Sequence, residues 1–282
     1  MKKQKCIFIL AVALMVAAGF SFYLQKHSVV NTSGGSVSVS AGQAILVDGD
    51  TGKVLYEKCA DERAYPASTT KIMTALITLE TLEKYESPME QKITVPPEAE
   101  GVEGSSLYLK AGEKISIEDL LYGLMLVSGN DAAVALAEII GGSQQTFVEM
   151  MNHRAEELHC SNTHFANPNG LFDENHYTTV RDMAIIAAEA MRNPTFRKIV
   201  GTADWKASRE DSAYLTFHNK NKTLQQYDGG NGVKIGYTKS SGRTLVASAE
   251  REGKTLICVV MSAPDWFNDA YRLMDYGFAQ LQ

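Results

Sequence analysis

The sequence predicts an α+β fold. An antiparallel sheet is built from N- and C-terminal segments and is flanked by helices, and an all-helical subdomain is inserted in the chain between these segments. Residues 44–47 and 53–56 flank a turn rich in Asp and Gly, which is typical of a β-hairpin. From residue 117 to residue 192, apolar residues recur at helical spacing. After residue 214 the pattern changes to alternation, which indicates that the chain returns to the sheet.

The composition allows a substantial core and argues against a nucleic-acid partner. The 282 residues are 45% hydrophobic and 9% aromatic, enough for one large domain or two small ones. The formal net charge is -6 and the sequence pI is about 5.6, so there is no basic footprint for nucleic acid.

Residues 1–25 are expected to be a signal peptide or an N-terminal membrane anchor. Three lysines precede an apolar run at residues 6–24, which fits an export signal and is just long enough to span a bilayer once. Residues 26–41 are rich in Ser, Val and Gly, so we expect a flexible linker before a folded domain at residues 42–282. This organisation places the domain outside the cytoplasm.

The three cysteines beyond this segment do not form a disulfide framework, because their number is odd and no two lie close in sequence. Cys258 lies in an apolar run and is expected to be a buried thiol. A bridge between Cys59 and Cys160 remains an open alternative.

The elements follow in chain order after the hairpin. A helix is predicted within residues 65–82, where apolar residues from Ile72 onward have the i, i+3, i+4, i+7 spacing of one buried face. Residues 86–104 are mostly irregular, with one short strand near residues 93–95. The helical subdomain spans roughly residues 105–200. Its four helices are expected at residues 117–127, 132–140, 145–158 and 179–192. A three-stranded meander and a last helix are expected at residues 232–238, 244–251, 255–263 and 266–281.

Ser68 and Lys71 are the first candidate catalytic pair in the sequence. At i, i+3 on one helix, the amine can reach the hydroxyl. The macrodipole disfavours a cation in the first turn, and a neutral lysine beside a serine is a base beside a nucleophile. The alternative is that Ser68 caps a core helix, but a capping box has Glu or Gln three residues later, where this chain has Lys71.

Two further motifs are weak alone. Ser128-Gly129-Asn130 lies between two predicted helices and also fits a helix stop followed by an Asn cap. Lys234-Ile235-Gly236 lies in the first strand of the meander, so its cation would project from a sheet edge. The similar Lys110-Ala111-Gly112 fits a solvated turn.

Together and in this order, S-x-x-K, S-x-N and K-x-G resemble the signature of penicillin-binding proteins and class A β-lactamases. From residue 43 to the C-terminus the chain resembles the D-alanyl-D-alanine carboxypeptidases of the S11 peptidase family. The resemblance implies the fold shared by DD-peptidases and serine β-lactamases. It also implies a peptidoglycan stem peptide ending in D-Ala-D-Ala as substrate, β-lactams as covalent inhibitors, no cofactor and no metal, at the outer face of a bacterial membrane or in the cell wall.

The resemblance also implies a role for each matching residue. Ser68 would attack the carbonyl of the penultimate D-alanine, Lys71 would take its proton, and Ser128 would relay a proton to the departing D-alanine. The substrate-binding residues would be Asn130, Lys234, Gly236, Tyr237 and Thr238. Among these, Asn130 would hold the substrate amide and Lys234 the terminal carboxylate, while the backbone amides of Ser68 and Tyr237 would form the oxyanion hole. Lys71 should therefore have a lowered pKa, because the helix N-terminus and Lys234 both disfavour its charge.

One departure and four alternatives qualify this prediction. Ile235 replaces the Thr usual in the third motif, so we expect altered affinity more than lost activity. A class A β-lactamase would need a Glu for deacylation, and Glu174-Asn175 does not have the required spacing. A zinc peptidase is disfavoured because the six histidines form no H-E-x-x-H or H-x-H motif. A D,D-endopeptidase of the same fold and a cell-wall-peptide binding protein without turnover remain open. Any membrane anchoring is expected to come from the N-terminal segment.

Overall fold

The computed structural model describes residues 37–209, 212 and 214–281. The predicted signal peptide or anchor and most of the predicted linker lie outside these residues. Within the described ranges, no helix combines the length and apolar character needed to cross a membrane.

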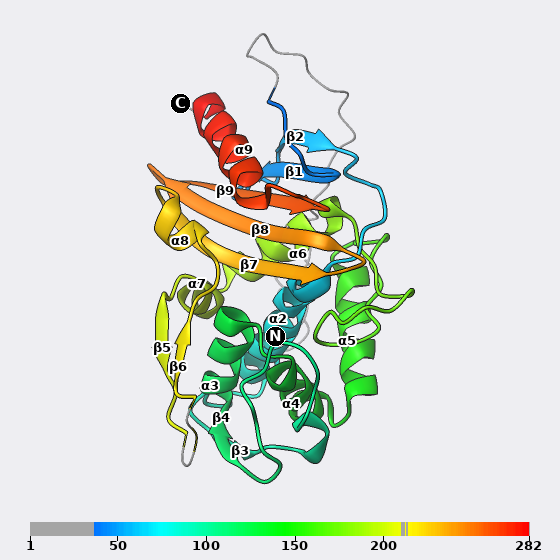
Figure 1. Cartoon of the computed structure of the whole chain (residues 1–282), viewed down its shortest axis with the longest axis vertical. Helices are drawn as coiled ribbons and strands as arrows, with labels where there is room; N and C mark the ends of the chain where they lie inside the picture. The colour runs from blue at the N-terminus through cyan, green and yellow to red at the C-terminus, as the bar shows by residue number, and fades with distance from the viewer. Residues whose placement is uncertain (1–36, 210–211, 213, 282) are drawn as a thin grey trace, which may run out of the picture. The chain divides into compact units, whose positions relative to one another are not determined.

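The central sheet has five antiparallel strands in the order β2-β1-β9-β8-β7 (Figure 1). Its strands are β1 (Gln43–Asp48), β2 (Val54–Lys58), β7 (Gly230–Thr238), β8 (Gly242–Arg251) and β9 (Lys254–Met261). The N-terminal hairpin therefore joins the C-terminal meander through the β1–β9 pair, which confirms the prediction that both ends of the chain share one sheet. In β1 and β9 nearly every residue is buried, because helices cover both faces.

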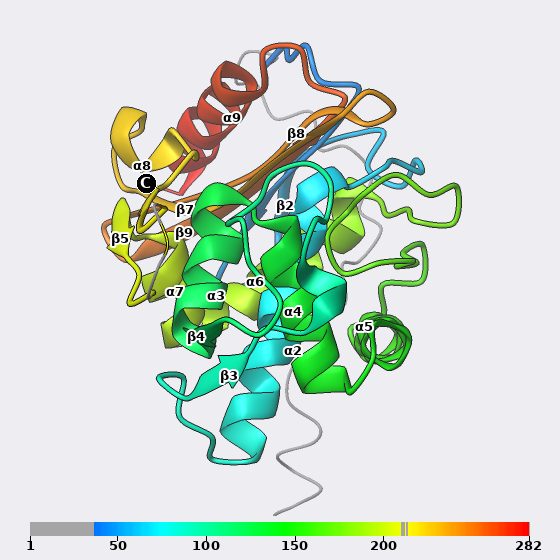
Figure 2. The ribbon, with the colours of Figure 1, turned by 60° about the horizontal axis from the view of Figure 1, so that its bottom comes forward.

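The helices lie on both faces of the sheet. They are α2 (Lys71–Lys84), α3 (Ile117–Tyr122), α4 (Asn130–Gly141), α5 (Gln144–Glu157), α6 (Val180–Arg192), α7 (Pro194–Val200), α8 (Thr223–Gln226) and α9 (Trp266–Gln280). Figure 2 shows α9 on one face, and α2, α6 and α7 on the other. The core beneath α9 includes Leu46, Leu245, Cys258 and Met274. The buried Cys258 agrees with its expected role.

The helical insertion is confirmed, with short elements that the sequence pattern did not predict. A 3-10 turn, η1 (Ala67–Thr70), precedes α2, another, η2 (Pro97–Ala99), lies in the irregular segment, and a π-helical turn, η3 (Gly123–Val127), ends α3. Two small hairpins pair β3 (Lys92–Thr94) with β4 (Lys114–Ser116), and β5 (Asp204–Lys206) with β6 (Thr216–His218). The strand expected at residues 93–95 is thus β3.

Local capping sets the starts of the insertion's helices. Thr179 accepts a hydrogen bond from the amide of Asp182 at 3.0 Å, so Thr179 rather than Thr178 caps α6. Ser143 caps α5 in the same way, through the amide of Thr146. The predicted helices at residues 132–140, 145–158 and 179–192 are therefore confirmed as α4, α5 and α6.

The folded domain begins before residue 42, which corrects the C-terminal end of the predicted linker. Val39 and Ala41 are buried, and the carboxylate of Asp269 in α9 accepts hydrogen bonds from the amides of Ser40 and Ala41. A buried carboxylate needs such donors, and these backbone amides supply them. A single stretch of sequence could not show that α9 would provide the partner.

The open alternative of a disulfide is also settled for the described cysteines. Cys59 is exposed, Cys160 is buried, and both are free thiols. Cys160 instead contacts the carbonyl of Asp182 at the start of α6.

Candidate active site

Ser68 lies in η1, immediately before α2. Thr69 and Thr244 fix this turn by donating hydrogen bonds from Oγ1 to the carbonyl of Pro66, at 2.7 and 3.1 Å. Ser68 makes no capping bond to the helix backbone, so the alternative in which it serves as an N-cap is wrong. Its partly exposed hydroxyl lies 3.1 Å from Nζ of Lys71.

Lys71 is completely buried, and its amine has three polar neighbours. Nζ lies 3.1 Å from Oγ of Ser68, 2.7 Å from Oδ1 of Asn130 and 2.6 Å from the carbonyl oxygen of Asn169. The last two are amide oxygens, which accept hydrogen bonds but cannot donate them. None of these three neighbours neutralises an ammonium charge.

The surroundings of Lys71 hold its pKa well below that of an exposed lysine. Burial is the main cause, because it disfavours the charged form, and repulsion from Lys234 adds to it. Asp131 acts in the opposite direction, and Lys220 lowers the pKa further. The direction agrees with the prediction from Lys234 and the helix N-terminus, and burial, the largest cause, depends on the folded structure.

Asn130 begins α4 and has a fixed amide orientation. Its Nδ2 donates to the carbonyl of Glu103 at 2.7 Å, so Oδ1 faces Lys71. The neighbouring Asp131, which is buried, accepts hydrogen bonds from the amides of Leu107 and Leu109 and thereby fixes the loop that contains Glu103. Asp131 is thus a supporting residue that the motif alone did not reveal.

Ser128 follows the π-helical turn η3 and has a left-handed backbone conformation, with φ 68°. Such a conformation is uncommon for a residue other than glycine and often marks a functional position. Ser128 is 6% exposed, two residues before Asn130. The S-x-N motif therefore reverses the chain between α3 and α4 and brings Asn130 to Lys71.

Lys234 lies on the edge strand β7, as predicted, and is 1% exposed. Its Nζ donates to the carbonyl of Ile235 at 3.1 Å. Burial, with repulsion from Lys220, lowers the pKa of Lys234 to about 7. Lys220 donates from Nζ to the carbonyl of Val127, so it places a third cation beside the S-x-N turn.

Alternation along β7 separates the residues of the third motif. Lys234 and Gly236 pair with Val246 and Thr244 on the face covered by α2, α6 and α7, whereas Ile235 packs against the core beneath α9. The side chain at position 235 is therefore absent from the face that holds Lys234. Lys110, in the similar motif, is exposed in a turn as expected.

The other β7 residues predicted to bind substrate differ in what they offer. A Cβ at Gly236 would lie 2.8 Å from the backbone nitrogen of Ser68, so glycine allows the strand to approach the serine turn. Tyr237 is 64% exposed, and its side chain is on the face of Ile235, opposite to that of Lys234. The hydroxyl of Thr238 bonds to Oγ of Ser241 in the following turn.

Gly170, in the loop at residues 165–178, lies against η1 and has a φ of 86°. A Cβ there would lie 1.9 Å from the carbonyl oxygen of Ala67. We expect Gly170→Ala to cost at least about 3 kcal/mol, because steric overlap adds to backbone strain. At the control position Gly253, φ is 72° and nothing lies within 4 Å, so alanine should cost only about 1–2 kcal/mol. Urea unfolding measures both, and equal losses would contradict the close approach.

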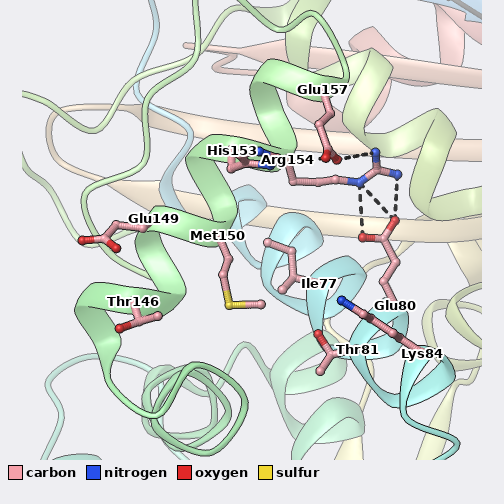
Figure 3. Close-up of a pocket in the computed structure, with 10 residues that line it drawn as sticks. All are labelled: Ile77, Glu80, Thr81, Lys84, Thr146, Glu149, Met150, His153, Arg154 and Glu157. Carbon is pink, nitrogen blue, oxygen red and sulfur yellow. Dashed lines mark hydrogen bonds and ion pairs between the residues drawn. The ribbon is translucent and has the colours of Figure 1, made fainter.

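The pocket in Figure 3 is separate from this site. It lies between the C-terminal half of α2 and α5, and an ion pair of 2.7 Å between Arg154 and Glu80 closes one side. Ser68 and Lys71, at the other end of α2, do not line it.

Besides Asp131, three contributors to the site were not predicted from the sequence. The Asn169 carbonyl is a backbone group, so it leaves no side-chain signal. Lys220 is a single lysine outside any recognised motif. His176 is buried and hydrogen-bonded to Thr70, next to Lys71. His153, His159 and His164 are exposed. Within the described ranges, no group of three or more metal-ligating side chains was found.

Two solved structures with the same fold are DD-peptidases. The crystal structure of the Streptomyces K15 DD-transpeptidase matches with a TM-score of 0.80 and 34% identity, over 87% of this chain and all of that one. A D-alanyl-D-alanine carboxypeptidase from Mycobacterium tuberculosis H37Rv matches with a TM-score of 0.81 and 31% identity, over 88% of this chain and 95% of that one. Fold and sequence together define the class as a serine DD-peptidase.

Sequence relatives give the family. The model of the peptidase S11 family, D-alanyl-D-alanine carboxypeptidase, matches residues 29–265. D-alanyl-D-alanine carboxypeptidase DacF of Bacillus subtilis is 37% identical over 286 residues, covering all of this chain and 72% of that protein. The chain belongs to this family and is a serine-type D-Ala-D-Ala carboxypeptidase that acts on peptidoglycan.

Proposed function

We propose that Ser68 is the nucleophile of this carboxypeptidase and that neutral Lys71 is its general base. The supporting observation is the set of neighbours around Nζ of Lys71. A neutral amine has two N–H bonds and one lone pair, and the oxygens of Asn130 and Asn169 accept both N–H bonds. The lone pair is then directed at Ser68, whose hydroxyl can donate its proton to Lys71.

The proposed reaction proceeds through an acyl-enzyme. Oγ of Ser68 forms a bond to the carbonyl carbon of the penultimate D-alanine while its proton moves to Lys71. The backbone amides of Ser68 and Tyr237 stabilise the oxyanion. The C–N bond then breaks, and Ser128 relays a proton from Lys71 to the departing D-alanine. Water hydrolyses the ester and restores the serine.

Cations next to the serine account for specificity toward a free C-terminus. Lys234 is buried on β7 and Lys220 lies beside the S-x-N turn, so the site is electropositive. We propose that Lys234 binds the terminal carboxylate of the stem peptide, and that Asn130 and the backbone of β7 bind its amide groups. A bound carboxylate would compensate the charge of Lys234, which has no acidic hydrogen-bond partner among the described residues.

A β-lactam presents an amide and a carboxylate like those of D-Ala-D-Ala, so penicillin should acylate Ser68. Intact mass spectrometry after incubation with penicillin, followed by peptide mapping, tests this proposal. We expect one covalent adduct on Ser68. Folded protein without an adduct, or with an adduct on another residue, would contradict it.

The stability of that adduct distinguishes a carboxypeptidase from a β-lactamase. Lys71 contacts a carbonyl and a carboxamide, and no carboxylate among the described residues is hydrogen-bonded to it. The site therefore has no evident acidic general base for deacylation. We expect an adduct that persists for minutes or longer, whereas rapid penicillin turnover would favour the β-lactamase alternative.

We further propose that residues 1–25 export the enzyme and hold it at the membrane if they are not cleaved.

A further inference from the structure

We propose that His176 is a positioning residue that acts through Thr70 to hold the Asn169 carbonyl against Lys71. This inference rests on the proposed role of Lys71 as the base. His176 is 2% exposed and lies at the end of the loop that contains Asn169. Its ring nitrogens contact two segments that are far apart in sequence: Nε2 lies 2.7 Å from Oγ1 of Thr70, and Nδ1 lies 3.0 Å from the amide of Ala166.

The hydrogen bonds assign the tautomer of His176. A backbone amide can only donate, so Nδ1 accepts from Ala166 and carries no proton. In the neutral ring the proton is then on Nε2, which donates to Oγ1 of Thr70. The ring therefore links the start of the loop to the residue immediately before Lys71.

Hydrogen bonds of Asn167 brace the loop, so we expect a displacement at Ala166 to be transmitted to Asn169. Oδ1 of Asn167 accepts the amide of Gly170 at 2.7 Å, and Nδ2 of Asn167 donates to the carbonyl of Leu171. These bonds close the segment into a compact turn. Because each bond spans only three or four residues, we expect the carbonyl groups of this turn to move together.

Two more bonds attach this turn to α2. Thr74 donates from Oγ1 to the carbonyl of Pro168 at 2.6 Å, and Lys71 donates to the carbonyl of Asn169. Thr70, the last residue of η1, and Lys71 and Thr74, in the first turn of α2, thus contact the loop from one side of the helix. Of these three contacts, only that of Thr70 is made to a side chain of the loop, the imidazole of His176. A substitution of His176 can therefore change this contact, whereas the other two are made to the loop backbone.

The neutral form of His176 is the one that makes both bonds. Burial lowers the pKa of His176 to about 4, and the charged or titratable neighbours that modify this effect are Asp173, His164 and Lys71. The ring is therefore neutral at physiological pH. A doubly protonated ring could not accept from Ala166.

Thr70→Val tests the link, because valine has a similar volume and removes the acceptor. We expect acylation by a chromogenic β-lactam to slow by about ten- to a hundredfold, as for other small misplacements of catalytic groups. With a D-Ala-D-Ala peptide, kcat should fall while KM changes little, since Lys234 is untouched. Thr70→Ser, which keeps the hydroxyl, should restore most of the rate.

A matched control and a double variant separate positioning from simple destabilisation. Thr78→Val removes another buried hydroxyl of α2, one that bonds only to the carbonyl of Thr74, and should leave acylation unchanged. Adding His176→Phe to Thr70→Val should slow acylation no further than the worse single change. Rates are expressed per active site titrated by prolonged penicillin labelling.

The outcomes distinguish this inference from the proposed function. Wild-type acylation in Thr70→Val, or independent effects of the two changes in the double variant, would overturn the positioning role of His176. If Lys71→Met also acylated normally, the proposed base would be wrong as well. Loss of acylation in Lys71→Met together with a normal rate in Thr70→Val would overturn only the role of His176.

Discussion

Lys71→Met should slow acylation of Ser68 by penicillin about a thousandfold, within the range usual for loss of a general base. Methionine fills a similar volume but has no lone pair on nitrogen to receive the serine proton. Because Lys71 is completely buried and amide oxygens occupy two of its three hydrogen-bonding directions, water has little access to replace it. The rate is measured by stopped-flow fluorescence or by quenched mass spectrometry.

Lys71→Arg is the control that separates a base from a positive charge. Arginine remains protonated at any physiological pH, so it preserves the charge and cannot accept the proton. If Lys71 acts as a base, both variants should be similarly slow. A variant with arginine that acylated within about tenfold of the wild-type rate would show that the charge of Lys71, rather than its lone pair, serves the reaction.

The pH dependence of acylation is a second test of Lys71 as the base. Lys71 must be neutral to act, and its pKa is lowered by burial and by Lys234. Acylation should therefore lose rate as the pH falls through the lowered pKa, and should already be near its plateau well below the pH at which an exposed lysine loses its proton.

The sequence predicted those parts of the fold that depend on local periodicity. Alternation identified β1, β2 and the β7–β9 meander, and helical spacing identified α4, α5, α6 and α9. The strands of three residues, such as β4 and β5, are too short to show a period. They form because a partner strand lies beside them, which is a property of the folded chain.

In the active site, too, the sequence predicted the motif residues but not the groups that surround them. Ser68, Lys71, Ser128, Asn130 and Lys234 were predicted from the three motifs. The groups that determine how Lys71 behaves come from distant segments that no local pattern connects: the Asn169 carbonyl is 98 positions from Lys71, and His176 is 106 positions from Thr70. Burial, the main cause of the lowered pKa of Lys71, results from the whole insertion folding around α2.

Two buried lysines in one site are expected to reduce the stability of the domain. Lys71 has two amide acceptors, whereas among the described residues Lys234 donates only to the carbonyl of the next residue. Removing Lys71 would leave those acceptors without a donor, so its replacement has opposing effects on stability. Among the described residues, replacing Lys234 leaves no comparable pair of acceptors without a donor. It is therefore the simpler test of how much a buried charge reduces stability.

Lys234→Met should therefore stabilise the substrate-free enzyme while weakening its reaction with peptides and β-lactams. Replacing a buried charged group by an apolar one of similar volume is often neutral or stabilising by about 1–4 kcal/mol. We expect a gain in the free energy of unfolding within this range near neutral pH, measured by urea denaturation. Lys239→Met, an exposed lysine in the turn after β7, should change stability by less than about 0.5 kcal/mol.

The pH dependence of this gain identifies its cause. Burial lowers the pKa of Lys234 to about 7 from its ordinary value of 10.5, so between these values the unfolded chain binds more protons than the native protein. Wild-type stability should consequently rise with pH across that window relative to the variant, by at most about 1.4 kcal/mol per pH unit. The advantage of Lys234→Met should be largest at or below pH 7 and should shrink toward pH 10. An advantage that stays constant over this range would mean that packing, and not the buried charge, stabilises the variant.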